Sequence, residues 1–353
     1  MEMRYKLLGG SGLKVSEISL GTMTFGEDWG FGASAEACRG ILEAYRARGG
    51  NFIDTANKYT NGSAERIVGE LVRGDRGAWV IATKYSLSMN DADPSASGNG
   101  RKNLVQSVEA SLKRLGTDYI DLLWVHAWDW TTPEAELMRA LDDVVRAGKV
   151  LYVGMSDAPA WVVSRANAIA ELRGWSPFIG IEIEYSLIER TVERELVPMA
   201  SRLGLGVLAW APMAGGVLTG KYTRGGGKDA ARAAMNQGRL DERGLRVARA
   251  VDAVADELGC SSAQVALAWL RSRPAQVIPI IGARKPEQMQ DCLGCLDVVL
   301  PAAALERLDA ASRVPLGFPY EFLGDPGTER VVYGATAARL DVTNPVRRLA
   351  SGG

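Results

Sequence analysis

The stretch Gly50-Asn51-Phe52-Ile53-Asp54-Thr55-Ala56-Asn57-Lys58-Tyr59 runs from turn residues through a short apolar strand to a carboxylate, with a phenol one loop later. An ionisable side chain that ends a buried apolar strand must find a partner or face a polar pocket. Asp54 and Tyr59 therefore predict part of a reaction centre, and other parts of the chain must supply the partners.

Strand-like runs similar to this one recur along the chain. They are short, rich in Val, Ile and Leu and not strictly alternating, as expected for strands that are buried on both faces. The eight runs are Ile18–Leu20, Asn51–Ile53, Trp79–Thr83, Tyr119–Val125, Val150–Met155, Ile179–Glu184, Gly206–Trp210 and Val277–Ile281.

Helical patterns separate these runs, with apolar residues three or four positions apart. Proline in a first helical turn and glycine just past a helix end support several of them. They cover Ser34–Arg48, Ala64–Arg73, Asn103–Leu115, Pro133–Ala147, Pro159–Leu172, Val192–Leu203, Gly244–Leu258 and Pro286–Leu293, with a second helix in the seventh unit at Ser261–Arg271 and a closing helix at Pro301–Ser312.

Eight strand–helix units predict a single-domain (β/α)8 TIM barrel over residues 1–353, preceded by a small hairpin at residues 5–15. The alternative is a doubly wound sheet, but Gly21-Thr22-Met23-Thr24-Phe25-Gly26 lacks the spacing of a dinucleotide fingerprint. Long loops at about 87–100 and 214–243 belong to the C-terminal face of such a barrel. The tail, about 314–353, is expected to wrap the barrel or fray.

Composition narrows the function. The chain has 353 residues, 47% of them hydrophobic, and a net charge of -1, which gives no long-range attraction to nucleic acid or an anionic membrane. No signal-peptide core or membrane-spanning run is visible, so a cytoplasmic protein is expected. The lone pair Cys292 and Cys295 has no second pair, and the chain has one histidine, so packing is favoured over a metal site.

Two further predicted strands also end on ionisable residues, Lys84 and His126. Taken singly, Asp54 could cap a helix, Lys84 could reach solvent, and His126 could be a satisfied core residue. Tyr59 could be an ordinary loop aromatic. Their joint placement at one end of adjacent strands predicts a shared site.

Over essentially its whole length the chain resembles the aldo-keto reductase superfamily, and within it a bacterial branch similar to potassium-channel beta subunits and aryl-alcohol dehydrogenases. The matching stretches are Gly50–Tyr59, Gly62–Glu65 with Gly69, Ala82–Lys84, Ser111–His126, Gly148–Lys149, Gly154–Ser156, Tyr185–Leu187 and Ile278–Arg284. The resemblance implies that the family's catalytic positions are Asp54, Tyr59, Lys84 and His126.

The implied activity is NADPH-dependent reduction of an aldehyde or ketone, reversible to alcohol oxidation. Tyr59 would act as the general acid. A phenol has an ordinary pKa near ~10, and the ammonium of Lys84 would lower it. Asp54 would hold Lys84, and His126 would orient the carbonyl oxygen.

Cofactor positions carry over from the same resemblance and favour NADP(H), because the guanidinium of Arg284 can bind the additional phosphate; the alternative for Arg284 is a solvated turn charge. Ser156, Asp157, Glu182 and Trp210 match residues at the nicotinamide. The pyrophosphate segment is Ala211, Pro212, Met213, Gly215, Gly216 and Leu218, and the adenosine end is Gly282, Arg284, Gln288 and Asp291.

Three residues depart from the family pattern, which usually has Gln, Asn and Tyr where this chain has Glu182, Asp157 and Trp210. An ionised carboxylate only accepts hydrogen bonds, whereas an amide also donates them. Glu182 could accept from the carboxamide NH2, be protonated, or point elsewhere; the first is our hypothesis.

The predicted substrate is a small carbonyl or alcohol compound with apolar, ring-bearing or sugar character, because aromatic residues dominate the loops that should wall the pocket. No nucleic acid or membrane partner is expected, and a homo-oligomer is allowed. The alternative function is a cofactor-sensing regulatory subunit like the channel beta subunits. The expected walls are Trp29, Phe31, Tyr85, Trp128 and Trp130.

Overall fold

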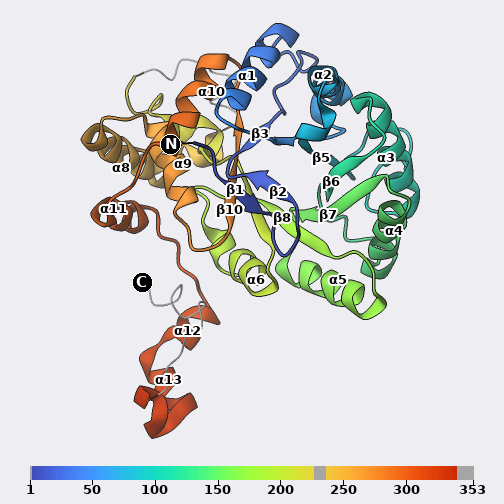
Figure 1. The fold of residues 1–353 in the computed structure, drawn as a ribbon. Helices are drawn as coiled ribbons and strands as arrows, with labels where there is room; N and C mark the ends of the chain where they lie inside the picture. The colour runs from blue at the N-terminus through green and yellow to red at the C-terminus, as the bar shows by residue number, and fades with distance from the viewer. Residues whose placement is uncertain (1, 226–235, 340–353) are drawn as a thin grey trace.

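The computed structural model describes residues 2–225 and 236–339 of the chain. Eight parallel strands close into a barrel, in which β10 pairs with both β9 and β3, so the predicted (β/α)8 fold is confirmed (Figure 1). The strands are β3 (Ser19–Gly21), β4 (Phe52–Asp54), β5 (Val80–Tyr85), β6 (Ile120–Val125), β7 (Val150–Ser156), β8 (Phe178–Glu184), β9 (Gly206–Trp210) and β10 (Val277–Gly282).

Helices surround the barrel at the predicted places. Ser34 caps the first of them with its side chain, and Ser261 and Gln264 form a reciprocal capping box at the start of α9. The helices are α1 (Ala35–Ala47), α2 (Ser63–Val72), α3 (Arg101–Leu115), α4 (Glu134–Arg146), α5 (Ala160–Arg173), α6 (Leu196–Leu203), α8 (Glu242–Leu258), α9 (Ser262–Arg271), α10 (Pro286–Leu293) and α11 (Ala302–Ser312).

The loop predicted at about 214–243 contains two short 3-10 turns, η4 (Ala214–Thr219) and η5 (Gln237–Arg239); its residues 226–235 lie outside the described part of the chain. Both cysteines of the C-x-x-C pair are buried and free, and burial raises the pKa of each thiol to about 12. They remain neutral thiols, as packing residues should.

The barrel separates two apolar layers. Most of the core lies between the strands and the helices, and a smaller cluster fills the barrel interior. Leu8 and Val15 of the predicted hairpin, β1 (Tyr5–Leu7) with β2 (Lys14–Ser16), belong to this interior cluster. The hairpin lies across one end of the barrel (Figure 1), where Gly9 donates to Gln276, just before β10. It therefore closes the end at which the strands begin.

The middle of the barrel is filled by the indole of Trp124 on β6, which is fully buried. Its neighbour on β7 is Gly154, where an added Cβ would come within 2.2 Å of the indole ring. Only a residue without a side chain leaves room for this ring. Trp124 thus forms the floor of the space at the opposite, C-terminal end.

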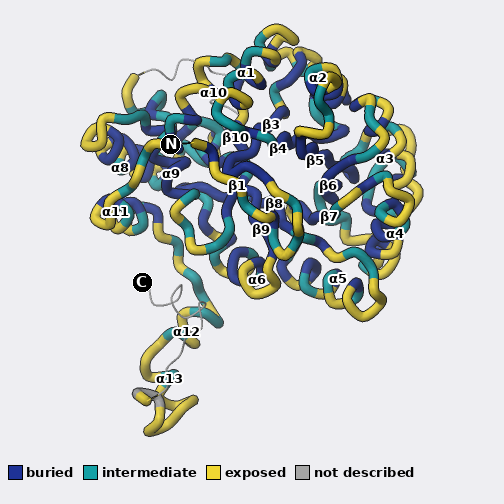
Figure 2. Tube along the Cα trace, viewed as in Figure 1, coloured by how far each residue is buried: buried dark blue, intermediate teal, exposed yellow. Residues whose placement is uncertain are grey.

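The C-terminal tail differs from the prediction. It neither wraps the barrel nor frays up to Arg339: α12 (Tyr320–Gly324), α13 (Pro326–Tyr333) and η7 (Gly334–Arg339) stand away from the barrel (Figure 1) and are largely exposed (Figure 2). Local signals produce this helix, because Asp325 caps α13 and Pro326 occupies its first turn. Residues 340–353 lie outside the described part.

Candidate active site

Alternation along the strands positions the site. Successive side chains on a strand point to opposite faces of the sheet. On β5, Val80 and Ala82 belong to the interior cluster and Ile81 belongs to the outer layer, so Lys84 points inward. The same alternation on the other strands brings polar residues to the C-terminal end of the interior. They are Asp54, Lys84, His126, Ser156, Glu182 and Trp210.

Lys84 lies at the centre of this group and is 1% exposed. Its Nζ donates to Oδ2 of Asp54 at 2.5 Å, to the hydroxyl of Tyr59 at 3.2 Å and to the carbonyl of Thr55 at 3.2 Å. Oε1 of Glu182 lies 3.1 Å from the same nitrogen. The structure thus brings the predicted Asp54, Lys84 and Tyr59 into one hydrogen-bonded chain and adds Glu182 to it.

The electrostatics of Tyr59 differ from the expectation. Burial raises the pKa of the phenol, and this effect exceeds the lowering by the Lys84 ammonium. Asp54 and Glu182 raise that pKa further. Burial alone would lower the pKa of Lys84, but Asp54 and Glu182 hold it above its ordinary value. The site therefore keeps a protonated phenol beside a charged ammonium.

His126 completes the group from the end of β6. Its ring meets that of Tyr59 edge-on, with the ring centroids 5.9 Å apart and an interplanar angle of 86°. Burial, with some repulsion by Lys84, lowers the pKa of the imidazole to about 3. A neutral imidazole carries one N–H donor. It can donate that hydrogen to a carbonyl oxygen placed between the imidazole and the phenol.

The residues predicted at the nicotinamide lie beside this group. Ser156 and Glu182 are paired across β7 and β8, and both are buried. Asp157 has a left-handed φ of 45°, and its Oδ1 accepts from Nε1 of Trp210 at 3.0 Å. Glu182 faces Lys84, so one of its oxygens already contacts the lysine ammonium.

The segment after β9 contains several residues with left-handed backbone angles. Gly215 and Gly216 both have left-handed φ angles, and so do two alanines, Ala211 at 48° and Ala214 at 50°. Non-glycine residues in this region store backbone strain, which concentrates at functional sites. The side chain of Leu218 is buried in the core, so only its backbone can reach a ligand.

The predicted adenosine end lies after β10. The backbone N–H of Arg284 donates to the side chain of Gln288 at 2.9 Å. Among the described residues, the guanidinium of Arg284 has no hydrogen bond or ion pair, so it can take an anionic partner. The carboxylate of Asp291 is engaged instead, because it accepts from Ser261 and Gln264 at the start of α9.

The five aromatic residues predicted to wall the pocket lie in different surroundings. Trp29 and Phe31 pack on each other with centroids 5.9 Å apart. Trp128 packs against the outer core, whereas Trp130 is 69% exposed and contacts Trp161 of α5 at 6.5 Å. Trp161 was not predicted as a wall residue, although its position in the first turn of the helix after β7, at the C-terminal face, could have indicated it.

The prediction that Tyr85 lines the pocket is wrong. Tyr85 follows Lys84 on β5, and neighbouring strand residues point to opposite faces. Because Lys84 points inward, the ring of Tyr85 is fully buried in the outer core, where its hydroxyl donates to the carbonyl of Asn99 at 3.0 Å. Tyr85 anchors the loop at 87–100 instead.

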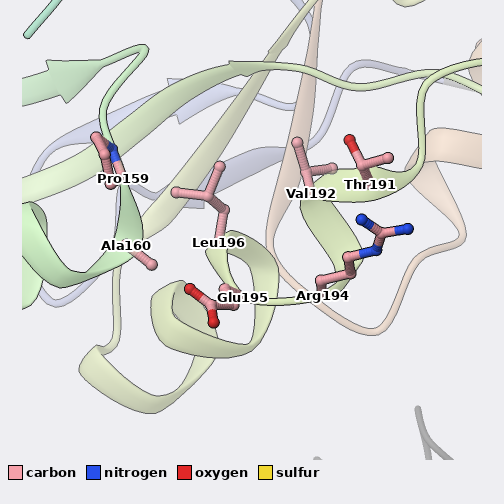
Figure 3. A pocket seen from close by; sticks show the side chains of 7 residues that line it. All are labelled: Pro159, Ala160, Thr191, Val192, Arg194, Glu195 and Leu196. Carbon is pink, nitrogen blue, oxygen red and sulfur yellow. The ribbon is translucent and has the colours of Figure 1, made fainter. Parts of the chain in front are cut away.

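The described residues also form a cavity of about 250 Å³ between the loops after β7 and β8, lined by the side chains in Figure 3. Arg194, on its rim, donates to the carbonyl of Pro315 at the start of the tail. None of the predicted site residues lines this cavity. The polar group around Lys84, rather than this hollow, is therefore the candidate active site.

A family model described as the Aldo/keto reductase family matches residues 17–313. The chain is 37% identical to norsolorinic acid reductase of Aspergillus flavus, over 92% of this chain and 84% of that protein. It is 36% identical to aryl-alcohol dehydrogenase [NADP(+)] of Phanerodontia chrysosporium, over 94% and 91%, and 34% identical to aldo-keto reductase ausK of Aspergillus calidoustus, over 92% and 86%.

The chain therefore belongs to the aldo-keto reductase family, and it is an oxidoreductase that reduces carbonyl groups with NADP(H). These relatives are fungal, so they do not support the bacterial branch expected from the sequence. Across residues 2–225 and 236–339, no helix has the length and apolar character needed to cross a membrane.

Proposed function

We propose that Tyr59 is the general acid of carbonyl reduction, that Lys84 and Asp54 support it, and that His126 orients the substrate oxygen. The observation that carries this assignment is the buried chain in which Asp54 holds Lys84 at 2.5 Å and Lys84 donates to Tyr59 at 3.2 Å. Such a chain keeps a proton donor next to a fixed positive charge.

NADPH, when bound, supplies the hydride that adds to the carbonyl carbon. Negative charge then develops on the carbonyl oxygen, and the O–H bond of Tyr59 breaks as a new O–H bond forms there. The ammonium of Lys84 stabilises the phenolate that remains. The N–H of the neutral His126 holds the oxygen in line, and alcohol oxidation uses the same groups in reverse.

The residues after β7 to β10 fit the cofactor. Strained backbone and the two left-handed glycines after β9 allow close approach of a pyrophosphate, and the guanidinium of Arg284 is available for a phosphate. We assign the nicotinamide to Ser156, Asp157, Glu182 and Trp210, the pyrophosphate to Ala211, Pro212, Met213, Gly215, Gly216 and Leu218, and the adenosine phosphate to Gly282, Arg284, Gln288 and Asp291.

The proposed substrates are aromatic aldehydes and ketones and the matching alcohols, which places the chain in an aryl-alcohol-dehydrogenase-like branch that acts on CH–OH groups. Support comes from the indole and phenyl rings of Trp29, Phe31, Trp128 and Trp130 at the C-terminal face, and from the similarity to the aryl-alcohol dehydrogenase of Phanerodontia chrysosporium. The regulatory-subunit alternative is not favoured, since the relatives are named as reductases and dehydrogenases.

The test is Tyr59→Phe, which removes the proton donor and keeps the ring. We expect turnover to fall by about 10²–10⁴-fold, while NADPH binding measured by fluorescence survives. Tyr5→Phe is the matched control, because Tyr5 is an exposed tyrosine outside the proposed site whose hydroxyl donates to the carbonyl of Gly49. Undiminished NADPH oxidation by Tyr59→Phe would overturn the proposed mechanism.

The same assay, run on a panel of aromatic aldehydes, aliphatic ketones and keto-sugars, tests the substrate class. We expect the highest kcat/KM with the aromatic aldehydes. A preference for keto-sugars would contradict the proposed class but would leave the role of Tyr59 intact.

A further inference from the structure

Two carboxyl groups share one ammonium in this site. Oδ2 of Asp54 lies 2.5 Å and Oε1 of Glu182 lies 3.1 Å from Nζ of Lys84. All three side chains are at most 2% exposed. If both carboxyls were ionised, two negative charges would face one positive charge out of contact with water, which is unfavourable for groups this close.

The second oxygen of each carboxyl indicates how the charge is balanced. Oδ1 of Asp54 and Oε2 of Glu182 are both buried, and neither has a hydrogen-bond partner among the described residues. Both carboxyls converge on the same nitrogen, so a hydrogen bond between the two side chains, which requires a proton on one of them, would give these oxygens a partner. A single shared proton would satisfy both carboxyls, as it does in other carboxylate pairs.

We propose that Glu182 is a positioning residue that shares one proton with Asp54 over Lys84, and that this acid pair keeps Tyr59 in its phenol form and so biases the site toward carbonyl reduction. The proposal rests on the proposed role of Tyr59. Of the three alternatives for Glu182 (accepting from the carboxamide, being protonated or pointing elsewhere), it selects protonation. It therefore gives Glu182 a role in proton transfer.

Burial favours a proton on the pair, and the positive charge of Lys84 opposes it. Burial raises the pKa of both Asp54 and Glu182, and Asp54 and Asp157 raise that of Glu182 further, whereas Lys84 of β5 lowers the pKa of both carboxyls. The other facing groups are Tyr59 after β4, His126 after β6 and Asp157 after β7, whose own pKa burial also raises.

The charge of the acid pair determines the sign of the pH effect on Tyr59. In this proposal, the pair gives up its shared proton as pH rises. The cluster then has two carboxylates against one ammonium, and the additional negative charge raises the pKa of Tyr59. Wild-type protein therefore keeps the proton donor for reduction to higher pH, and it reaches the phenolate needed for alcohol oxidation only at more alkaline pH.

The experiment compares Glu182→Gln with Glu184→Gln in the full-length chain. Both residues lie on β8, but the carboxylate of Glu184 pairs with Arg239 at 2.5 Å. Phenolate absorbance of the cofactor-free protein is titrated in each background with and without Tyr59→Phe, so that Tyr59 is separated from the other nine tyrosines. The alkaline limb of kcat/KM for carbonyl reduction is recorded in parallel.

We expect Glu182→Gln to lower the pKa of Tyr59 and to move the alkaline limb by about one pH unit or more toward lower pH. Glu184→Gln should leave the pKa of Tyr59 in place. In infrared difference spectra, the band of a protonated carboxylic acid should be present in wild type and absent in Glu182→Gln. Asp54→Asn should remove the same band, because a shared proton requires both partners.

Identical phenol titration and an identical alkaline limb in wild type and Glu182→Gln would overturn this proposal, as would survival of the acid band in both Glu182→Gln and Asp54→Asn. Failure of the proposed role of Tyr59 would give a different experimental result. If Tyr59→Phe turned over normally, the general acid would be misassigned, whatever the titration of Glu182→Gln showed.

Discussion

At the scale of single residues, His126 shows how burial selects a protonation state. It is the only histidine of the chain, and its pKa is lowered to about 3 because the imidazolium would be buried near Lys84. The neutral ring is the form that can donate one hydrogen bond without adding a second positive charge beside the lysine.

The absence of any other histidine makes this state directly measurable. We expect the imidazole C–H resonances in NMR spectra of the full chain to stay at their neutral positions from pH 8 down to pH 5. A titration midpoint near ~6.5, the value of a solvated histidine, would contradict the burial described for this ring.

The same lowered pKa has a consequence for stability. The unfolded chain binds a proton at His126 below pH ~6.5, but the folded chain does not, so stability is present above that pH and is lost as pH falls toward 3. Between pH 7 and pH 5, wild type should lose ~2 kcal/mol of unfolding free energy relative to His126→Asn. Urea unfolding of both proteins at the two pH values measures the difference, and parallel curves would argue against it.

Residue types at strand ends were enough to predict Asp54, Lys84 and His126 as one group, with Tyr59 in the loop beside them, because ionisable side chains rarely end buried strands without a partner. The direction of Tyr85 was predictable from the same strand, since it follows an inward lysine. The contact of Glu182 with Lys84 was not, because it depends on how the strands of the barrel face one another across the interior.

At the scale of elements, β6 and β7 depend on each other through Trp124 and Gly154. The eight strands and their helices could be predicted because each is a local apolar pattern. The match of an indole to a missing side chain on the next strand is a tertiary contact, which single-strand patterns do not contain.

This contact makes Gly154→Ala a sharp test of the barrel interior. The new Cβ would lie 2.2 Å from the Trp124 ring, so the strands must shift, and we expect a loss of about 1–3 kcal/mol in unfolding free energy. Gly74→Ala is the control, because a Cβ there meets nothing within 4 Å and the φ angle is ordinary. Equal stability of the two variants would contradict the tight fit of Trp124.

At the scale of the whole molecule, the barrel and the segment from α12 to α13 are built differently. The barrel buries its apolar residues in two layers, whereas Phe318, Phe322, Val331 and Val332 of the tail are between 56% and 86% exposed. The sequence did not predict this, since α13 forms from local capping and not from an apolar face packed on the barrel. A homo-oligomer stays a prediction.

The difference in burial between the barrel and the tail predicts that substitutions change the free energy of unfolding more in the barrel than in the tail. Leu308 of α11 is fully buried, and Leu308→Ala should lower the free energy of unfolding by about 2–5 kcal/mol. Phe322→Ser, in the exposed α12, should change it by less than about 0.5 kcal/mol. Urea unfolding checks both; a loss from Phe322→Ser as large as that from Leu308→Ala would mean that the tail contributes to the folded core.

The hairpin that closes one end of the barrel also limits how protons travel. Leu8 and Val15 lie at the end at which the strands begin, and Trp124 fills the middle, so apolar side chains separate the polar group around Lys84 from that end. We therefore expect protons to exchange with solvent through the C-terminal mouth, which is also where the proposed cofactor and substrate would bind. If so, the number of protons in the group is set before the ligands enter, and the pH of the medium acts on the open enzyme between turnovers.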